Sequence, residues 1–237
     1  MKKKTKLYIA PVHLALKNGH FDAIRALVNQ GADLNQKQSD GRTLLHEACR
    51  RSNFEQVKFL LEEYKEKINI MVKDVNGESS AMISAKLGNN HILEEIFKFA
   101  SNSTTISANF FIQKDSRDQN FFHIAAGKNS ARIVDLLFKY CSNQRTLVKL
   151  LSATKESLIT SHFKLSNTPV HAALSLGNKE FVQAVMHNVI EMKKKSLPSD
   201  GKNSLTMSAV DISFLSDEAI LEILSSILDE FKEPATH

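Results

Sequence analysis

The chain has 237 residues, of which 42% are apolar and 24% charged, a composition typical of a folded protein rather than a disordered one. A net charge of +5 and a pI near 9.1 favour acidic partners slightly, but fall short of the dense Lys/Arg stripes of a dedicated nucleic-acid binder. Two cysteines argue against a disulfide framework or a zinc ligand set. No apolar run is long enough for a membrane span or a secretory signal peptide.

A four-residue motif recurs along the chain and marks six predicted units. Its last residues are separated by 33, 36, 41, 48 and 35 positions. Self-similarity at such a period is typical of proteins built from stacked repeats. The copies, in chain order, are Ala10–His13, Thr43–His46, Ser79–Met82, Asn120–His123, Thr168–His171 and Asn203–Thr206.

Each motif copy is predicted to begin a pair of helices. In the fifth copy Thr168 can cap free N–H groups, and Pro169 suits the first helical position because it has no N–H. Six residues after the motif, Gly19, Gly88 and Gly177 suit a helix end that needs left-handed backbone. A second helix follows, with apolar residues at i, i+3 and i+4 on one face. These sets are Ile24, Leu27 and Val28; Val57, Leu60 and Leu61; Leu93, Ile96 and Phe97; Val134, Leu137 and Phe138; and Val182, Val185 and Met186.

The motif resembles the Thr-Pro-Leu-His-x-Ala signature of the ankyrin repeat, whose period is about 33 residues. Tight turns at Asp40-Gly41, Asn76-Gly77 and Asp200-Gly201 precede three copies, and residues 31–35 match the end of a repeat. The resemblance implies an all-α ankyrin-repeat solenoid of about six stacked helix-turn-helix units with two insertions between repeats. We expect one domain over residues 1–237. Its predicted repeats are approximately 7–39, 40–73, 74–114, 115–163, 164–199 and 200–233, the last being a C-terminal cap.

Three copies depart from the family pattern. Met82 and Thr206 stand where the family has the histidine that bridges neighbouring loops, so we expect looser junctions there. The first copy lacks its Asp-Gly turn, which favours a half-repeat cap.

The two long gaps between motifs predict insertions. Residues 98–117 contain a polar loop and the apolar triplet Phe110–Ile112, which we expect to pack under its own loop rather than form an exposed contact site. Residues 142–165 predict an extra helix or a lengthened second helix, because Leu147, Val148, Leu150 and Leu151 can share one helix face. Insertions in repeat proteins often lie on the binding face.

No residue pattern predicts catalysis. Four histidines, His13, His46, His123 and His171, occupy the signature position, where the family uses them structurally. A nucleophile pair of Cys49 with a histidine lacks an orienting third residue, and no P-loop or metal-ligand spacing is present. We therefore predict that the chain is not an enzyme and holds no metal or cofactor.

The family resemblance implies a partner-binding surface on the first helices and the turn tips. A strip rich in basic residues there is expected to receive an acidic segment of a partner protein. The alternative is that these residues are ordinary solubilising charges, and the Arg50-Arg51 pair most favours binding. The predicted partner-binding residues are Lys17, Arg42, Glu47, Arg50, Arg51, Lys86, Leu87, Lys114, Arg117 and Lys128, with Asn18, Lys37 and Lys73 near them.

Other functions stay open at this point. The chain could be the targeting module of a larger enzyme whose catalytic region lies outside these residues. Nucleic-acid binding is not expected, because aromatic residues for base stacking are absent from the basic strip. A composition rich in Lys, Asn, Ser and Ile resembles ankyrin proteins that intracellular bacteria secrete into host cells, so we expect a cytoplasmic monomer, in the host cytosol if it is such an effector.

Overall fold

The computed structural model describes residues 10–102, 109–141, 143, 146–147, 150–151 and 168–196. They fall into two compact units, each described by itself. Unit 1 comprises described residues 10–102 and 114–116, and unit 2 comprises 109–113 and those from 117 onward. The regular elements of the described residues are all helices, accompanied by an isolated antiparallel bridge between Lys73 and Ser79, so the predicted all-α fold is confirmed.

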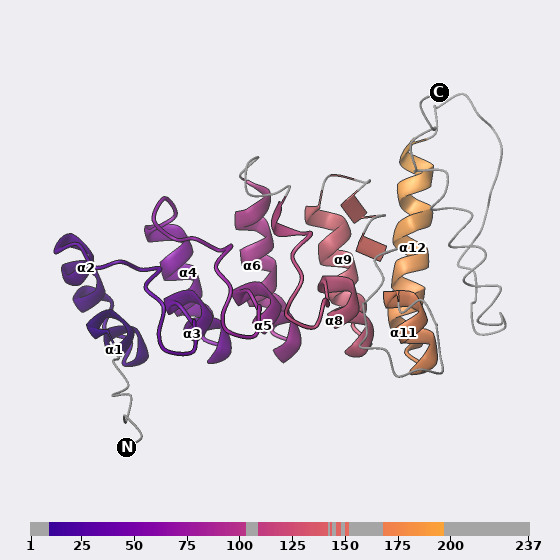
Figure 1. Cartoon of the computed structure of the whole chain (residues 1–237). Coiled ribbons are helices and arrows are strands. Elements are labelled where there is room, and N and C mark those ends of the chain that lie inside the picture. Colours follow the sequence, from indigo (N-terminus) through magenta and orange to yellow (C-terminus); the bar gives the residue numbers. More distant parts are fainter. Residues whose placement is uncertain are drawn as a thin grey trace, which may run out of the picture. The chain divides into compact units, whose positions relative to one another are not determined.

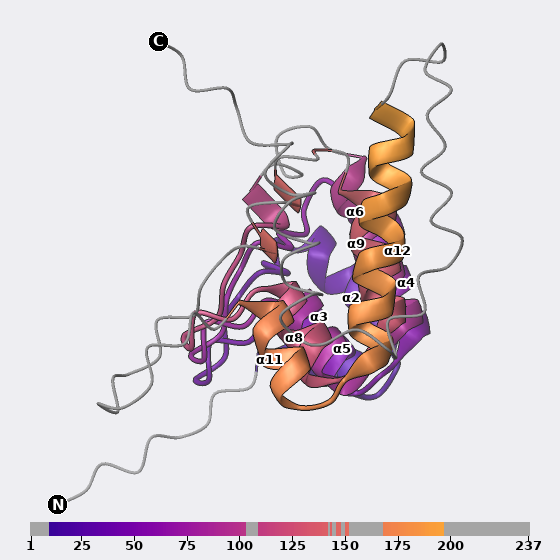
Figure 2. The same cartoon turned by 90° about the vertical axis from the view of Figure 1, so that its right-hand side faces the viewer.

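Unit 1 consists of paired helices (Figure 1). The first helices of the pairs are α1 (Pro11–Lys17), α3 (Leu44–Arg50) and α5 (Ser80–Leu87). The second helices are α2 (Phe21–Asn29), α4 (Phe54–Glu63) and α6 (Asn90–Ser101). Each first helix packs against its own partner, while α3 also packs between α1 and α5. The first helices therefore form one row and the second helices another (Figure 2).

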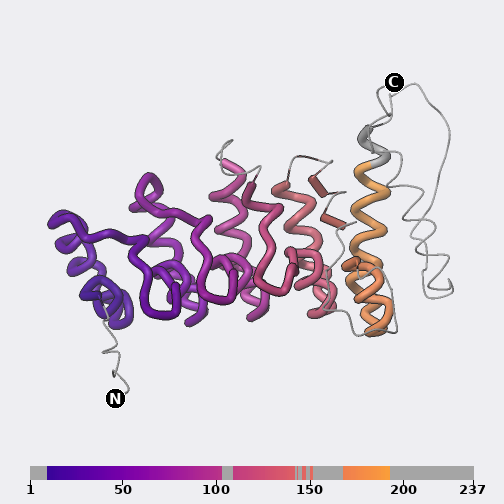
Figure 3. Tube along the Cα trace, in the orientation of Figure 1, coloured from indigo at the N-terminus to yellow at the C-terminus, as the bar shows by residue number. Residues whose placement is uncertain are grey.

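Unit 2 repeats the arrangement with longer connections. Its first helices are α8 (Phe121–Gly127) and α11 (Pro169–Ser175), and its second helices are α9 (Ala131–Tyr140) and α12 (Lys179–Ser196). Within this unit α8 packs against α11 and α9 against α12, so the pairs are stacked in register (Figure 3).

The helix boundaries follow from local chemistry, as predicted. The Thr168 side chain accepts a hydrogen bond from the backbone N–H of His171, and Pro169 occupies the first turn of α11. Gly88, with φ of +76°, ends α5 in left-handed backbone. The equivalent positions after α3 and α8 hold Ser52 and Asn129, which adopt the same conformation at φ of 56° and 49°. Left-handed backbone is thus a property of the repeat rather than of glycine alone.

The predicted core faces are buried. In α4, for example, Val57, Leu60 and Leu61 are shielded from solvent, and α6 buries Leu93, Ile96 and Phe97. Burial of such faces between neighbouring pairs is what stabilises a stacked repeat, since one pair alone cannot cover its own apolar residues.

The expectations for the insertions and the terminal repeats are confirmed only in part. Phe110 and Phe111 are fully buried as expected, whereas Ile112 is 46% exposed. Of the 142–165 insertion, the described Leu147, Leu150 and Leu151 are buried, and Val148 lies outside the described residues. The first repeat carries both helices, α1 and α2, and the missing turn on which the expected half-repeat was based lies before the described residues. The predicted cap at 200–233 lies outside the described residues.

Candidate protein-binding surface

The predicted surface of unit 1 is built on turns that approach one another closely. We call residues 37–42 and 73–78, with 114–116, the turn tips. A Cβ added at Gly41 would lie 2.9 Å from the Val75 nitrogen, and one at Gly77 would lie 2.6 Å from the Ser116 nitrogen. The Val75 N–H donates to the Asp40 carbonyl at 3.1 Å, so glycine permits a direct backbone hydrogen bond between successive tips.

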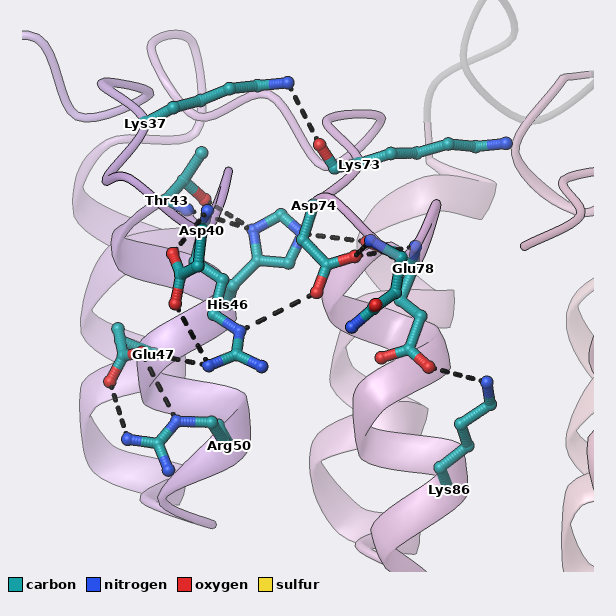
Figure 4. Close-up of polar contacts among 12 residues, drawn as sticks. Lys37, Asp40, Thr43, His46, Glu47, Arg50, Lys73, Asp74, Glu78 and Lys86 are labelled. Carbon is teal, nitrogen blue, oxygen red and sulfur yellow. Dashed lines mark hydrogen bonds and ion pairs between the residues drawn. The ribbon is translucent and has the colours of Figure 1, made fainter. Parts of the chain in front are cut away.

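Lysine side chains reinforce this stacking of the turn tips. The Lys37 ammonium donates to the Lys73 carbonyl at 3.0 Å (Figure 4). The Lys73 ammonium donates in turn to the Lys114 carbonyl at 2.5 Å. Lys37, Lys73 and Lys114 thus hold equivalent places, and each of the first two reaches forward by one repeat. The same lysines line the tips with positive charge.

The signature histidine of the second repeat joins its own repeat to the next. His46 Nδ1 lies 2.8 Å from the Thr43 hydroxyl, and Nε2 lies 3.2 Å from the Glu78 carbonyl (Figure 4). Burial lowers the pKa of His46, so the neutral ring is favoured, with Nε2–H donating to that carbonyl. In unit 2 His171 Nδ1 lies 2.7 Å from the Thr168 hydroxyl, and His123 Nδ1 lies 2.8 Å from the amide oxygen of Asn120, each within its own repeat.

Glu47 organises the predicted arginines into one cluster. Its carboxylate lies 3.1 Å from Arg50 Nη2 and 3.5 Å from Arg51 Nε, and Arg42 Nη1 is 4.0 Å away. Partial burial works to raise the pKa of Glu47, but the hydrogen bond to Arg50 and the charges of the arginines outweigh it, so the pKa is lowered. Arg51 also donates to the Lys17 carbonyl at 3.3 Å, which ties α3 to α1.

Arg42 connects the Glu47 cluster to the next turn tip. Its guanidinium lies 3.2 Å from Asp40 and 3.7 Å from the fully buried carboxylate of Asp74. Asp74 also accepts hydrogen bonds from the backbone N–H groups of Asn76 and Glu78, at 2.9 and 3.0 Å. Arg42 therefore has a structural role in addition to any contact with a partner.

Lys86 provides a link at the repeat that lacks the histidine. Its ammonium lies 2.6 Å from Glu78 and 2.7 Å from Asp115, whose side chain is almost fully buried. Partial burial works to lower the pKa of Lys86, but hydrogen bonds to Asp115 and Glu78 raise it overall. A salt bridge thus connects these turn tips where Met82 has no hydrogen-bonding side chain.

The structure brings most of the predicted binding residues into unit 1. The members in unit 1 are Lys17, Arg42, Glu47, Arg50, Arg51, Lys86, Leu87 and Lys114. Of these, Lys17, Arg50, Arg51 and Leu87 are exposed at the ends of α1, α3 and α5. Arg117 and Lys128 are exposed in unit 2.

A small pocket lies beside the Glu47 cluster, and sequence reasoning did not predict it. It has a volume of about 170 Å³, and its polar lining includes His13, Gln38 and Gln56 together with Arg50 and Arg51. A signal for it was present in the sequence: Ala10 stands where the second repeat has Thr43, so His13 lacks the hydroxyl partner that His46 has.

The chemistry of the cysteines supports no nucleophile. Burial raises the pKa of the Cys49 thiol to about 12 and that of Cys141 to about 11. Both thiols are therefore protonated near neutral pH, and a buried thiol is a poor nucleophile. Within the described residues no three His, Cys, Asp or Glu side chains gather as a potential metal site, and no helix has the length and hydropathy of a membrane span.

Comparison with known proteins agrees with this architecture. A family model for ankyrin repeats (3 copies) matches residues 2–74. Rabankyrin-5 of Mus musculus is 25% identical over 176 residues, which is 74% of this chain and 13% of that protein. The NF-kappa-B inhibitor cactus of Drosophila melanogaster is 47% identical over 60 residues, which is 25% of this chain and 12% of that protein. Human ankyrin repeat and SOCS box protein 16 is 39% identical over 71 residues, which is 30% of this chain and 15% of that protein.

The chain therefore spans only a small part of the length of these relatives. The match to the family model and the stacked helix pairs of both units lead to the same assignment. Ankyrin repeats are thus shown for residues 2–74, and the stacked helix pairs that follow them are consistent with the same all-α repeat fold.

Proposed function

We propose that the chain binds a partner protein through the exposed ends of the first helices and the turn tips of unit 1, and that the partner presents an acidic segment there. The observation that carries this proposal is the arrangement at the end of α3. Arg50 and Arg51 are both exposed, and both form ion pairs with the single carboxylate of Glu47. Two guanidinium groups share one negative charge, so the cluster retains positive charge for a partner carboxylate.

The ion pairs of this cluster also favour binding in another way. Glu47 holds Arg50 and Arg51 at defined positions before a partner arrives. Ordering a long side chain on binding costs about 0.5–1.5 kcal/mol, so a side chain that is already ordered loses less. Arginine forms two parallel hydrogen bonds to a carboxylate, which adds geometric specificity to the attraction.

An apolar neighbour completes the proposed surface. Leu87 stands at the end of α5, at the position that Arg51 holds after α3, and half of its surface is exposed. A partner segment that carries an acidic residue followed by an apolar residue would match Arg51 and Leu87, respectively. We propose that Arg117 and Lys128 contact the same kind of partner from unit 2.

The direct test is affinity capture. Purified chain is used as bait in a host-cell lysate beside an Arg50→Glu/Arg51→Glu variant. A double variant of two exposed lysines on and after α4, Lys58→Glu/Lys65→Glu, changes the net charge equally elsewhere. A partner retained by wild type and by the lysine variant but lost by the arginine variant supports the proposal. Equal retention by all three places the binding surface elsewhere.

A second proposal concerns a longer protein. The matched segments cover only 10–15% of each relative, and one of them, rice XBOS33, is named a probable E3 ubiquitin-protein ligase. These repeats would then bring a substrate to a catalytic region outside the chain. Enzymatic turnover of a captured partner by the full-length gene product, but not by this chain, would support this targeting role.

We further propose that the chain acts as a monomer in the cytoplasm, which is the host cytosol if it is a secreted bacterial effector. The composition rich in Lys, Asn, Ser and Ile supports the effector origin, as do repeats that depart from the family signature. Sedimentation at the mass of a dimer would contradict the monomer. Failure to detect the chain in the cytosol of infected cells would contradict the effector role.

A further inference from the structure

The pocket beside the Glu47 cluster contains buried polar atoms that make no hydrogen bond within the described protein. His13 is 5% exposed, and neither of its ring nitrogens has a partner of hydrogen-bonding geometry. Gln56 donates from Nε2 to the Leu16 carbonyl at 2.7 Å, but its Oε1 is unpartnered. Buried polar atoms are almost always paired with protein, water or ligand. Unpartnered atoms that line a pocket therefore point to something that enters it.

The comparison with His46 shows what His13 lacks. The Thr43 hydroxyl contacts His46 Nδ1, and the Glu78 carbonyl receives Nε2–H. Ala10 offers no hydroxyl to His13, and the Arg42 backbone is near its ring but outside hydrogen-bonding geometry. His13 consequently makes neither of the two hydrogen bonds by which His46 joins its repeat to the next.

The rim of the pocket favours a negatively charged occupant. Lys17, Arg50 and Arg51 line it together with one carboxylate, that of Glu47. Lys17 forms no ion pair with a carboxylate of the described residues. The volume of about 170 Å³ would hold several waters at about 30 Å³ each, which is room for a carboxylate group with part of its side chain.

We propose that this pocket is an anchor site for one Asp or Glu side chain of the partner, and that His13 takes up a proton when the carboxylate binds. The proposal rests on the function proposed above and names a subsite within that surface. Arg50 and Arg51 would bind the carboxylate at the rim, and His13 would donate to it from within.

The proton uptake follows from the groups around the ring. Burial lowers the pKa of His13, while the charge of Glu47, the nearby Arg42 backbone and the charge of Asp40 partly oppose this effect. Lys17, Arg50 and Arg51 line the same pocket, so they add no negative charge that would favour a protonated ring. His13 is therefore neutral near pH 7 before binding, and an entering carboxylate stabilises its protonated form. By linkage, affinity rises as pH falls, by at most about tenfold per pH unit for one proton.

The experiment uses the whole chain with isotope-labelled histidine and follows the His13 ring resonance by NMR. The probes are N-acetyl-glutamate N-methylamide and its glutamine analogue, at constant ionic strength from about pH 8 to about pH 5.5. The glutamate probe should move the resonance toward its protonated position and bind more tightly at lower pH. The glutamine probe should leave it in place. No movement with the glutamate probe, or equal movement with both, overturns the proposal and assigns the pocket to water.

Variants separate this proposal from the proposed function. His13→Gln should weaken the arginine-dependent binding of a captured partner, most at low pH, and remove its pH dependence. Lys58→Gln, a control on α4, should keep both. A partner that depends on Arg50 and Arg51 while its pH dependence survives His13→Gln refutes the anchor site alone. A partner insensitive to both arginines refutes the proposed surface as well.

Discussion

Replacing Gly41 by alanine should destabilise unit 1 far more than the same change at Gly19. Both residues have positive φ, +78° and +72°, so an alanine at either place adopts left-handed backbone at a cost of about 1–2 kcal/mol. A Cβ at Gly19 meets nothing within 4 Å, whereas one at Gly41 lies 2.9 Å from the Val75 nitrogen and 3.1 Å from two Asp74 backbone atoms. The two substitutions therefore differ in steric contact and share the conformational cost.

The extra loss at Gly41 can be estimated from the contact it breaks. The turn tips must separate to admit the Cβ, which weakens the hydrogen bond from the Val75 N–H to the Asp40 carbonyl. One such bond contributes about 1 kcal/mol net. With backbone displacement added, we expect a total loss of about 2–4 kcal/mol for Gly41→Ala, against about 1–2 kcal/mol for Gly19→Ala.

Urea unfolding followed by circular dichroism measures both variants in the same buffer. The free energies of unfolding should differ by at least about 1 kcal/mol, with similar dependence on urea concentration. Equal losses would refute the reasoning, because they would mean that the turn tips do not approach closely enough for glycine to matter beyond its φ angle.

Three further predictions concern the core and the polar links. Leu60→Ala removes a fully buried side chain and should cost about 2–5 kcal/mol by urea unfolding; a negligible loss would place Leu60 outside the core. Lys86→Met leaves the buried carboxylate of Asp115 without this partner and should cost about 1–3 kcal/mol, whereas Lys98→Met, at an exposed pair, should stay within about 0.5 kcal/mol. The pKa of His46 is lowered in the folded state, so the unfolded chain binds a proton first as pH falls below about 6.5, and the free energy of unfolding should decrease there. His46→Gln should reduce this dependence of stability on pH, measured by thermal unfolding. An unchanged pH dependence would contradict the lowered pKa.

The sequence predicted the fold through residues with local physical meaning. Thr168 and Pro169 identified a helix start because capping and the missing N–H act within one turn. Gly88 identified a helix end for the same reason, since only the local φ angle matters. Ser52 and Asn129 hold the same left-handed conformation without glycine. There each side chain also meets a neighbouring repeat, Ser52 accepting from Asn89 and Asn129 from the Phe181 N–H.

The polar contacts of the candidate surface were predictable only in part. Glu47 lies three and four residues before Arg50 and Arg51, a spacing that already favours ion pairs on a helix. The salt bridge between Lys86 and Asp115 joins residues 29 positions apart, and no local rule predicts which side chains meet across repeats. The lack of a hydrogen bond to His13 likewise depends on the three-dimensional position of Arg42. Only the missing hydroxyl at Ala10 could be read from the sequence.

The role of the arginine pair is tested most directly by measuring the affinity of a purified, captured partner by titration calorimetry at low and high salt. The account predicts that Arg50→Gln/Arg51→Gln weakens binding by at least about tenfold and flattens its salt dependence, while Lys58→Gln/Lys65→Gln changes neither appreciably. Thermal unfolding of each variant confirms that the fold is retained. An affinity and salt dependence equal to those of wild type in the folded arginine variant would contradict the proposal that this surface of unit 1 receives the partner.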